Sequence, residues 1–330
     1  MSRNLAVTRL EKKMKILAVD DDELIREILS ATLEAHGYTD VTLAESGEDA
    51  LQKIAASPTP FEGFMFDIQM PGMDGTELCQ HVRQMEHYKN SPVIMITAMN
   101  NKEYVDRAFM AGATDYVTKP FDTTELMTRI RLADRLQSEA RKAAAAAASA
   151  PAATAAAPKP PFKDPVTVKD VRGVVKSAAL DNYVMLMLEQ KQFAMAAFAI
   201  RVPELEAVHA GSDIEEFTYV VTDVAEVISD CLVGAQAFLS YLGGGVFVCV
   251  GAKNKLPTAD SLHDEFVMML NDPDLVYCEE VATGFTAQIG EIAAPKLFEK
   301  RGDLRFLDRA VEKLNEVSSS PRSGGGRFAA

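Results

Sequence analysis

Four short runs near the start of the chain are strand candidates that each lead into a polar side chain, and this repetition constrains the fold more than any other feature. The runs are Ile16–Val19, Phe64–Phe66, Val93–Ile96 and Asp115–Thr118. They lead into Asp20 and Asp21, into Asp67, into Thr97 and into Lys119, respectively. Short apolar runs bounded by turn residues are typical of buried strands. Because the carboxyl ends of strands in an open parallel α/β sheet converge on one crevice, we expect these side chains to meet there.

Helical patterns alternate with the runs over residues 23–36, 46–56, 74–86, 101–111 and 122–142. One strand before each of the five helices, four of them being the runs above, predicts an α/β domain with a doubly wound, flavodoxin-like (βα)5 sheet.

The expected crevice has a definite chemistry. Carboxylates gathered at one sheet edge repel each other unless a cation lies among them, and Mg²⁺ suits such a site because it prefers oxygen ligands. An Asp beside this ion can attack phosphorus, which makes Asp67 a candidate nucleophile. Lys119 would then contact the phosphoryl oxygens. An ordinary alternative stays open for each residue, since an Asp after a strand is often a turn residue or a helix N-cap.

Four segments are similar to the receiver domain of two-component response regulators over residues 14–137: Ile16–Glu23, Phe66–Gly75, Met95–Ala98 and Gly112–Phe121. The resemblance implies that a histidine kinase or a histidine phosphotransfer protein phosphorylates Asp67. It implies that Mg²⁺ is bound by Asp20, Asp21, Asp67 and the backbone carbonyl of Gln69.

The same resemblance assigns the remaining receiver residues. Thr97 and Tyr116 would form the switch pair, and Lys119 would contact the phosphoryl group. Asp115 and Arg129 match positions that receiver dimers use, which implies a homodimer through the 101–142 face.

The length of 330 residues suggests two domains. Alanine and proline dominate residues 143–162, which indicates a semi-rigid linker between them. We therefore predict five parts along the chain: an N-terminal tail (1–13), a receiver domain (14–142), a linker (143–163), an output domain (164–317) and a disordered tail (318–330).

Strands and helices mix without strict alternation in the second half, which predicts an α+β domain. Helices are expected at 204–209, 214–232, 262–270 and 304–317, strands at 237–242, 246–250 and 281–289, and a hairpin turn at Gly243-Gly244-Gly245.

This half resembles a GGDEF, or diguanylate cyclase, domain. Asp164–Thr167, Leu242–Phe247 and Gln288–Gly290 carry the resemblance. The acidic residues of the cyclase site are missing: Gly245 and Val246 stand at the acidic positions of the signature loop, and Arg201 replaces a metal-binding Asp. We therefore predict a degenerate, inactive site formed by Arg201, Gly243, Gly244, Gly245 and Val246. Its output would be a contact with a downstream protein that the sequence does not identify.

Two further readings of the output domain stay open: a glycine turn that binds a nucleotide or supports residual cyclase activity, or another kind of α+β domain. A DNA-binding regulator is disfavoured, because residues 166–330 contain 15 Lys and Arg against 24 Asp and Glu, a net charge of −9. The whole chain carries −14, which argues against nucleic acid as a partner.

The remaining expectations concern the surroundings of the protein. We expect no membrane insertion, because no apolar run reaches 18 residues. The four cysteines show no metal-binding or redox spacing, and we interpret them as reduced thiols of a cytoplasmic protein.

Overall fold

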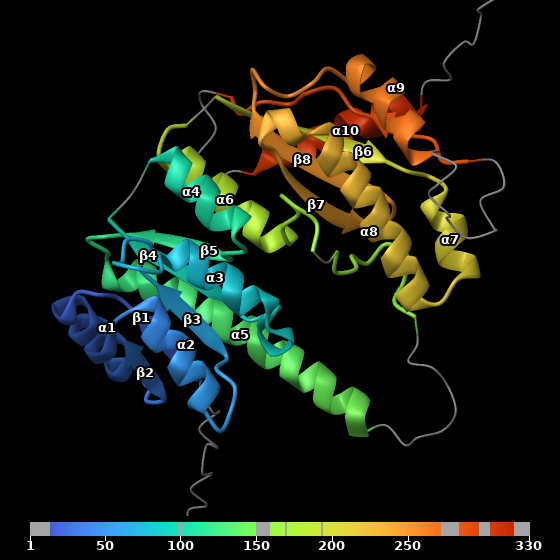
Figure 1. Cartoon of the computed structure of the whole chain (residues 1–330). Coiled ribbons are helices and arrows are strands. Elements are labelled where there is room, and N and C mark those ends of the chain that lie inside the picture. Colours follow the sequence, from blue (N-terminus) through green and yellow to red (C-terminus); the bar gives the residue numbers. More distant parts are fainter. Residues whose placement is uncertain are drawn as a thin grey trace, which may run out of the picture. The chain divides into compact units, whose positions relative to one another are not determined.

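The structure is a computed structural model, and it describes residues 14–98, 101–149, 159–168, 170–192, 194–271, 284–296 and 304–319. The chain divides into two compact units, Met1–Ala152 and Ala153–Ala330, and each is considered by itself (Figure 1). Among the described residues, no helix combines the length and the apolar character that crossing a bilayer requires.

The N-terminal unit has the predicted parallel sheet, with strand order β2-β1-β3-β4-β5. Its elements are β1 (Ile16–Val19), α1 (Glu23–Ala35), β2 (Val41–Ala44), α2 (Gly47–Ala56), β3 (Gly63–Phe66), α3 (Gly75–Gln84), the 3₁₀ turn η1 (Glu86–Tyr88), β4 (Val93–Thr97), α4 (Lys102–Met110), β5 (Asp115–Thr118) and α5 (Thr123–Ser149). This strand order is that of flavodoxin-like folds. The prediction for the receiver fold is therefore confirmed.

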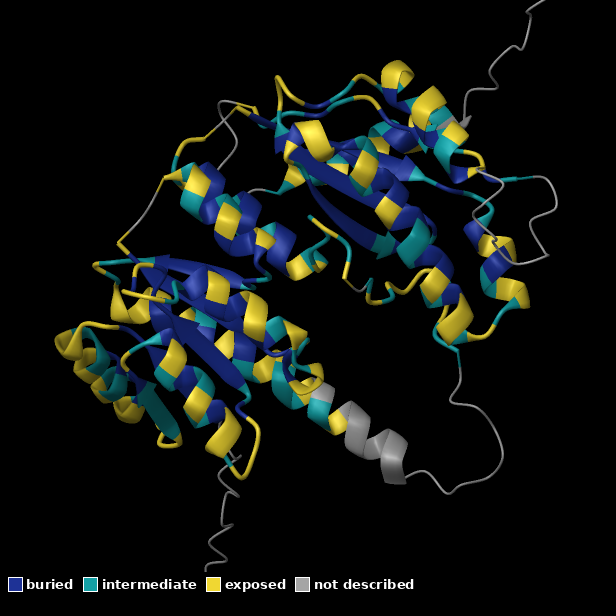
Figure 2. Ribbon diagram, viewed as in Figure 1, coloured by how far each residue is buried: buried dark blue, intermediate teal, exposed yellow. Residues whose placement is uncertain are grey.

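Helices cover both faces of this sheet. Leu29 and Leu33 of α1 and Leu126 and Ile130 of α5 pack in one cluster on one face. Strand side chains alternate between faces, so the other face is left for α2, α3 and α4. Strands β1, β3 and β4 are buried, the edge strand β2 is mostly half-buried, and the helices expose their outer sides, as Figure 2 shows.

Aspartate side chains cap the N-termini of two helices, α1 and α3, at the carboxyl-terminal edge of the sheet. Asp22 accepts a hydrogen bond from the amide of Leu24 at the start of α1, and Asp74 accepts bonds from the amides of Thr76 and Glu77 at the start of α3. Such caps satisfy amides that the first turn of a helix leaves without a partner. Asp22 is thus a helix N-cap, which is the ordinary role of an Asp that follows a strand.

Helix α5 continues through Ser149, beyond the predicted boundary at residue 142. Alanine is the best helix former, which accounts for the extension. The described part of the helix is tied to the sheet by polar contacts: Tyr38 donates to Asp134, Gln137 donates to the carbonyl of Glu62, and Arg141 pairs with the Glu62 carboxylate.

The C-terminal unit has a four-stranded antiparallel sheet with order β7-β8-β6-β9. Its elements are α6 (Ser177–Glu189), β6 (Met195–Arg201), α7 (Leu205–Gly211), α8 (Ile214–Cys231), the 3₁₀ turn η2 (Val233–Ala235), β7 (Phe238–Gly243), β8 (Val246–Ala252), α9 (Ala259–Leu270), β9 (Gln288–Ile289) and α10 (Arg305–Ser319). The predicted α+β class and the glycine hairpin are confirmed.

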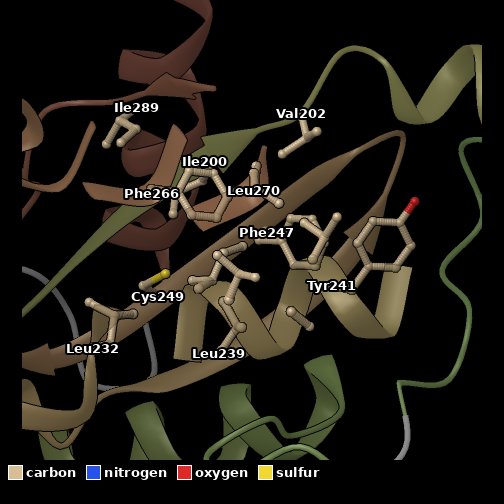
Figure 3. Packing of buried hydrophobic residues seen from close by; sticks show 14 of the residues in the cluster. Ile200, Val202, Leu232, Leu239, Tyr241, Phe247, Cys249, Phe266, Leu270 and Ile289 are labelled. Atoms are coloured by element: carbon tan, nitrogen blue, oxygen red, sulfur yellow. The ribbon is translucent and has the colours of Figure 1, made fainter. Parts of the chain in front are cut away.

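A layer of apolar side chains joins this sheet to α8 and α9. Phe247 and Cys249 of β8 lie among Leu239, Phe266 and Leu270, and Ile200 extends the layer onto β6 (Figure 3). The opposite face packs against α6, where the ring of Tyr183 lies tilted against that of Phe238, with ring centroids 4.5 Å apart.

The strand predicted at 281–289 is wrong in extent. Residues 281–283 lie outside the described residues, residues 284–287 form no strand, and only Gln288–Ile289 do. Side chains take the backbone hydrogen bonds that a neighbouring strand would have made. Asn271 bonds both the amide and the carbonyl of Phe285, and Glu204 accepts from the amide of Thr286.

Candidate functional site

The parallel register places the candidate residues of the N-terminal unit at one edge of its sheet. Val19 of β1 lies beside Phe66 of β3, and the amide of Asp67 donates to the carbonyl of Val19 at 2.9 Å. Asp20 and Asp67 therefore leave neighbouring strands at the same level. On the other side of the site, the amide of Lys119 donates to the carbonyl of Thr97, which aligns the ends of β4 and β5.

Lys119 bridges two carboxylates at the centre of this edge. Its Nζ lies 2.6 Å from Oδ2 of Asp20 and 2.7 Å from Oδ2 of Asp67. The side chains of Asp20 and Asp67 are 1% and 8% exposed. Burial raises the pKa of Asp20, and the Lys119 ammonium opposes this only in part. Burial would lower the pKa of Lys119, but its hydrogen bonds to the two carboxylates outweigh burial and raise it.

Asp21 completes an acidic cluster with Asp20 and Asp67. One carboxylate oxygen from each residue lies within 4.8 Å of the other two. Backbone amides fix two of these carboxylates, because Asp22 donates to Oδ1 of Asp20 at 3.1 Å and Gln69 donates to Oδ1 of Asp67 at 3.2 Å. The cluster thus presents oxygen donors from two loops whose backbone is held in place.

Thr97 and Tyr116 lie in the interior beside this cluster. Both residues are fully buried. Burial raises the pKa of the Tyr116 hydroxyl, and the negative charge of Asp67 raises it further. The tyrosine therefore lies within the electrostatic reach of Asp67. The structure brings together the predicted Asp20, Asp21, Asp67, Thr97, Tyr116 and Lys119.

A carboxylate on α2 holds the loop that follows Asp67. Oε1 of Glu48 accepts from the amide of Met73 at 3.1 Å. A Cβ on Gly75 would lie 1.9 Å from the carbonyl oxygen of Asp67, so the helix α3 begins in direct contact with the backbone of the candidate nucleophile. Sequence reasoning did not identify Glu48, because an exposed glutamate near a helix start has no distinctive pattern.

Asp115 and Arg129 form an ion pair within the chain. Nη1 of Arg129 lies 2.5 Å from Oδ1 of Asp115, and Nη2 lies 2.9 Å from Oε1 of Glu125. The predicted pair of dimer residues is thus already engaged inside this unit.

The glycine turn of the C-terminal unit is covered by its own chain. Gly243, Gly244 and Gly245 all have positive φ, and Val246 begins β8 directly after them. The amide of Gly244 donates to the carbonyl of Phe162, and the amide of Gly245 faces the hydroxyl of Tyr241. A Cβ on Gly243 would lie 2.1 Å from the carbonyl oxygen of Lys163, so only glycine permits this approach.

The covering segment is anchored on α7 and α8, and we call residues 159–164 the strap. The ammonium of Lys159 donates to the carbonyls of His209 and Ser212 at the end of α7. The ring of Phe162 lies against His209 and Phe217. Residues 159–163 of the strap belong to the segment that the sequence predicts as a linker.

Arg201 lies at the end of β6 and has an uncharged partner. Its Nη2 donates to Oδ1 of Asn315 in α10 at 2.8 Å. The register of β6 and β8 places Arg201 opposite Val246, directly after the glycine turn, while the amides of Gly244 and Gly245 face the carbonyl of Phe162 and the hydroxyl of Tyr241. The thiols of Cys79, Cys231 and Cys249 are free, and Cys278 lies outside the described residues.

The sheet order and the acidic edge are those of a receiver domain, and comparison with known proteins agrees. The family model for the response regulator receiver domain matches residues 16–131. The chain is 37% identical over 119 residues to the chemotaxis protein CheY1 of Helicobacter pylori, which covers 36% of this chain and 95% of that protein. This chain therefore belongs to the response regulator receiver family.

Other similar proteins extend beyond the shared region. The DNA-binding dual master transcriptional regulator RpaA of Synechocystis is 37% identical over 130 residues, which is 39% of this chain and 53% of that protein. The chain spans about half the length of the first curated relatives that it matches. A crystal structure of the chemotaxis protein CheY4 of Vibrio cholerae is 34% identical and covers 37% of this chain and 99% of that one, with a TM-score of 0.35.

Proposed function

We propose that this protein is a response regulator that accepts a phosphoryl group on Asp67 and signals through protein contacts of its C-terminal unit. The observation that carries the proposal is the meeting of three carboxylates and Lys119 at the carboxyl ends of three strands. A histidine kinase or a histidine phosphotransfer protein would be the donor, and the cytoplasm is the compartment that we expect for the exchange.

The acidic cluster fits a hard divalent cation of the Mg²⁺ type. Its donors are carboxylate oxygens close enough to share one ion, and Mg²⁺ prefers such donors. Asp20, Asp21 and Asp67 would hold the ion together with the backbone carbonyl of Gln69. Bound there, Mg²⁺ would neutralise charge on the phosphoryl oxygens during transfer.

The residues of the chain then act in order. A carboxylate oxygen of Asp67 attacks the phosphorus of a phosphohistidine, the P–N bond breaks, and the imidazole nitrogen leaves with the electron pair. Lys119 exchanges a carboxylate oxygen for a phosphoryl oxygen, because the new group carries more negative charge. Thr97 turns its hydroxyl toward the same oxygens, and Tyr116 follows into the space that Thr97 leaves. This movement changes the surface of α4, β5 and α5, which would also form any homodimer.

The C-terminal unit is, in our proposal, a GGDEF-like domain without cyclase activity. Three observations support the loss of activity. Arg201 stands where the resemblance requires a metal-binding Asp, the signature loop lacks its acids, and the amide of Gly244 is occupied by the strap. One fold can host many unrelated functions, so the activity must be judged from these residues and not from the antiparallel sheet and its helices.

Labelling with a small-molecule phosphodonor tests the phosphoacceptor. The variant Asp67→Asn should lose the label, whereas Asp40→Asn, which changes an exposed aspartate of a loop, should keep it. Equal labelling of Asp67→Asn and the unchanged protein would refute the assignment.

Incubation with GTP or ATP separates an inactive output unit from an enzyme. We expect no turnover with or without the phosphodonor. Turnover that Arg201→Ala removes would favour the alternative, a regulated nucleotide cyclase. A pull-down with phosphorylated and unphosphorylated protein should reveal at least one partner whose binding changes.

A further inference from the structure

Arg26 of α1 reaches back to the loop that carries the acidic pair. Its Nη1 donates to the carbonyl oxygen of Asp20 at 2.7 Å and to that of Asp21 at 3.0 Å. These carbonyls belong to the two residues that lie between the end of β1 and the cap of α1. A single guanidinium nitrogen thus holds two successive peptide groups.

Holding a carbonyl also directs the side chain next to it. A peptide group is planar, so fixing the direction of its C=O bond restricts the rotation of the residue that carries it. With the carbonyls of Asp20 and Asp21 held by Arg26, their carboxylates remain free to face Asp67. The amide of Asp22, which donates to Oδ1 of Asp20, restrains the same loop a second time.

We propose that Arg26 is a positioning residue for the divalent cation site, acting through the backbone of Asp20 and Asp21. The inference rests on the function proposed above and names a residue of that site that the resemblance did not assign. The contacts of Arg26 are with the carbonyls of Asp20 and Asp21, so its role would be exerted through the backbone and not on the ion itself. It acts by keeping the carboxylates of Asp20 and Asp21 in the orientation that a shared cation requires. Residues that hold metal ligands without binding the metal act in the same way in other proteins.

The charge of Arg26, considered alone, predicts the opposite effect on cation binding. A guanidinium near a cation site repels the incoming ion, so removing its charge should strengthen binding. Positioning predicts weaker binding when the two hydrogen bonds are lost, whether or not a positive charge remains. Lysine and methionine at position 26 therefore distinguish the two effects, because a lysine ammonium keeps the charge but lacks the planar geometry of the guanidinium.

The experiment is a titration of the unphosphorylated full chain with Mn²⁺, followed by the electron paramagnetic resonance signal of the free ion. We expect Arg26→Lys and Arg26→Met both to weaken Mn²⁺ binding by about tenfold. Arg135→Lys provides the matched control, since the side chain of Arg135 is 78% exposed and pairs with Glu139 on the outer side of α5. Asp21→Asn should weaken binding as well and confirms that the titration reports this site.

Phosphodonor labelling adds a second readout. In Arg26→Lys, the Mg²⁺ concentration for half-maximal labelling should rise about tenfold. The labelling rate at saturating Mg²⁺ should stay close to that of the unchanged protein, because a positioning residue acts on the occupancy of the site. If Arg26→Met fails to fold, Arg26→Lys, which keeps the charge and the aliphatic stem, decides the question alone.

Each remaining outcome has a definite meaning. Mn²⁺ binding by Arg26→Lys equal to that of the unchanged protein overturns the inference and leaves the proposed function intact. Tighter binding by Arg26→Met also overturns it, in favour of charge repulsion. If the unchanged protein binds no Mn²⁺, or Asp21→Asn binds it equally well, the metal site proposed above fails and the inference fails with it.

Discussion

Replacing Lys119 by methionine should destabilise the N-terminal unit in the absence of divalent ions. The ammonium lies 2.6 and 2.7 Å from two buried carboxylates. At an effective dielectric constant near 20, each attraction amounts to about 6 kcal/mol. The desolvation of the buried groups offsets most of this, and breaking one side of a buried pair costs about 3–5 kcal/mol in measured cases.

We expect a loss of stability near the lower end of this range, because the variant can relieve the repulsion between the carboxylates of Asp20 and Asp67. Burial already raises the pKa of Asp20, so without the ammonium this carboxyl can take up a proton. We therefore expect a loss of roughly 3 kcal/mol, or a fall of about 10 °C in the unfolding temperature of this unit. Added Mg²⁺ should restore more stability in the variant than in the unchanged protein, since the ion replaces the missing positive charge.

Thermal unfolding followed by circular dichroism, in chelator and in excess Mg²⁺, measures both effects. Lys102→Met is the matched control, because Lys102 pairs with Asp106 on the surface of α4 and such a pair contributes about 0–1 kcal/mol. If Lys119→Met unfolds within about 2 °C of this control, the bridge does not hold the carboxylates together and the argument is refuted.

Two further predictions follow from single residues. Burial raises the pKa of Asp115 to about 6 although Arg129 lies beside it. The contribution of this carboxyl to stability is therefore full below about pH 4 and is lost as the pH rises through about 6. A carboxyl carbon resonance of Asp115 that titrates below about pH 4 would contradict this. Gly243→Ala should destabilise the C-terminal unit by at least about 2 kcal/mol, because φ is +88° and the new Cβ would meet the carbonyl of Lys163. Gly234→Ala, where a Cβ meets nothing within 4 Å, should be near neutral in the same denaturation experiment.

The acidic edge of the N-terminal unit could be predicted because two regularities coincide. Apolar runs mark the strands, and strand ends in a parallel sheet meet at one edge, so the sequence alone predicts that Asp20, Asp67 and Lys119 lie together. Arg26 and Glu48 could not be predicted in the same way. Each acts through a backbone group, and charged residues on the outer sides of helices follow no pattern that names their partner.

The C-terminal unit was predicted less completely for a related reason. Its hairpin has a clear signal in three successive glycines, whereas the short edge strand β9 does not. An apolar run suggests a strand wherever it occurs. Here the side chains of Asn271 and Glu204 bond the backbone groups of Phe285 and Thr286 that an extended β9 would need. Such competition by distant side chains becomes visible only after the chain has folded.

The strap has a practical consequence for producing the C-terminal unit by itself. A polypeptide that starts at Pro165 would lack the main chain against which Gly243 and Gly244 lie, and it would remove the ring of Phe162 from its contact with Phe217. Starting at Lys159 keeps the anchor on α7 together with the cover of the hairpin. The choice of the first residue therefore determines whether the isolated fragment reproduces the fold or exposes surface that the strap covers in the full chain.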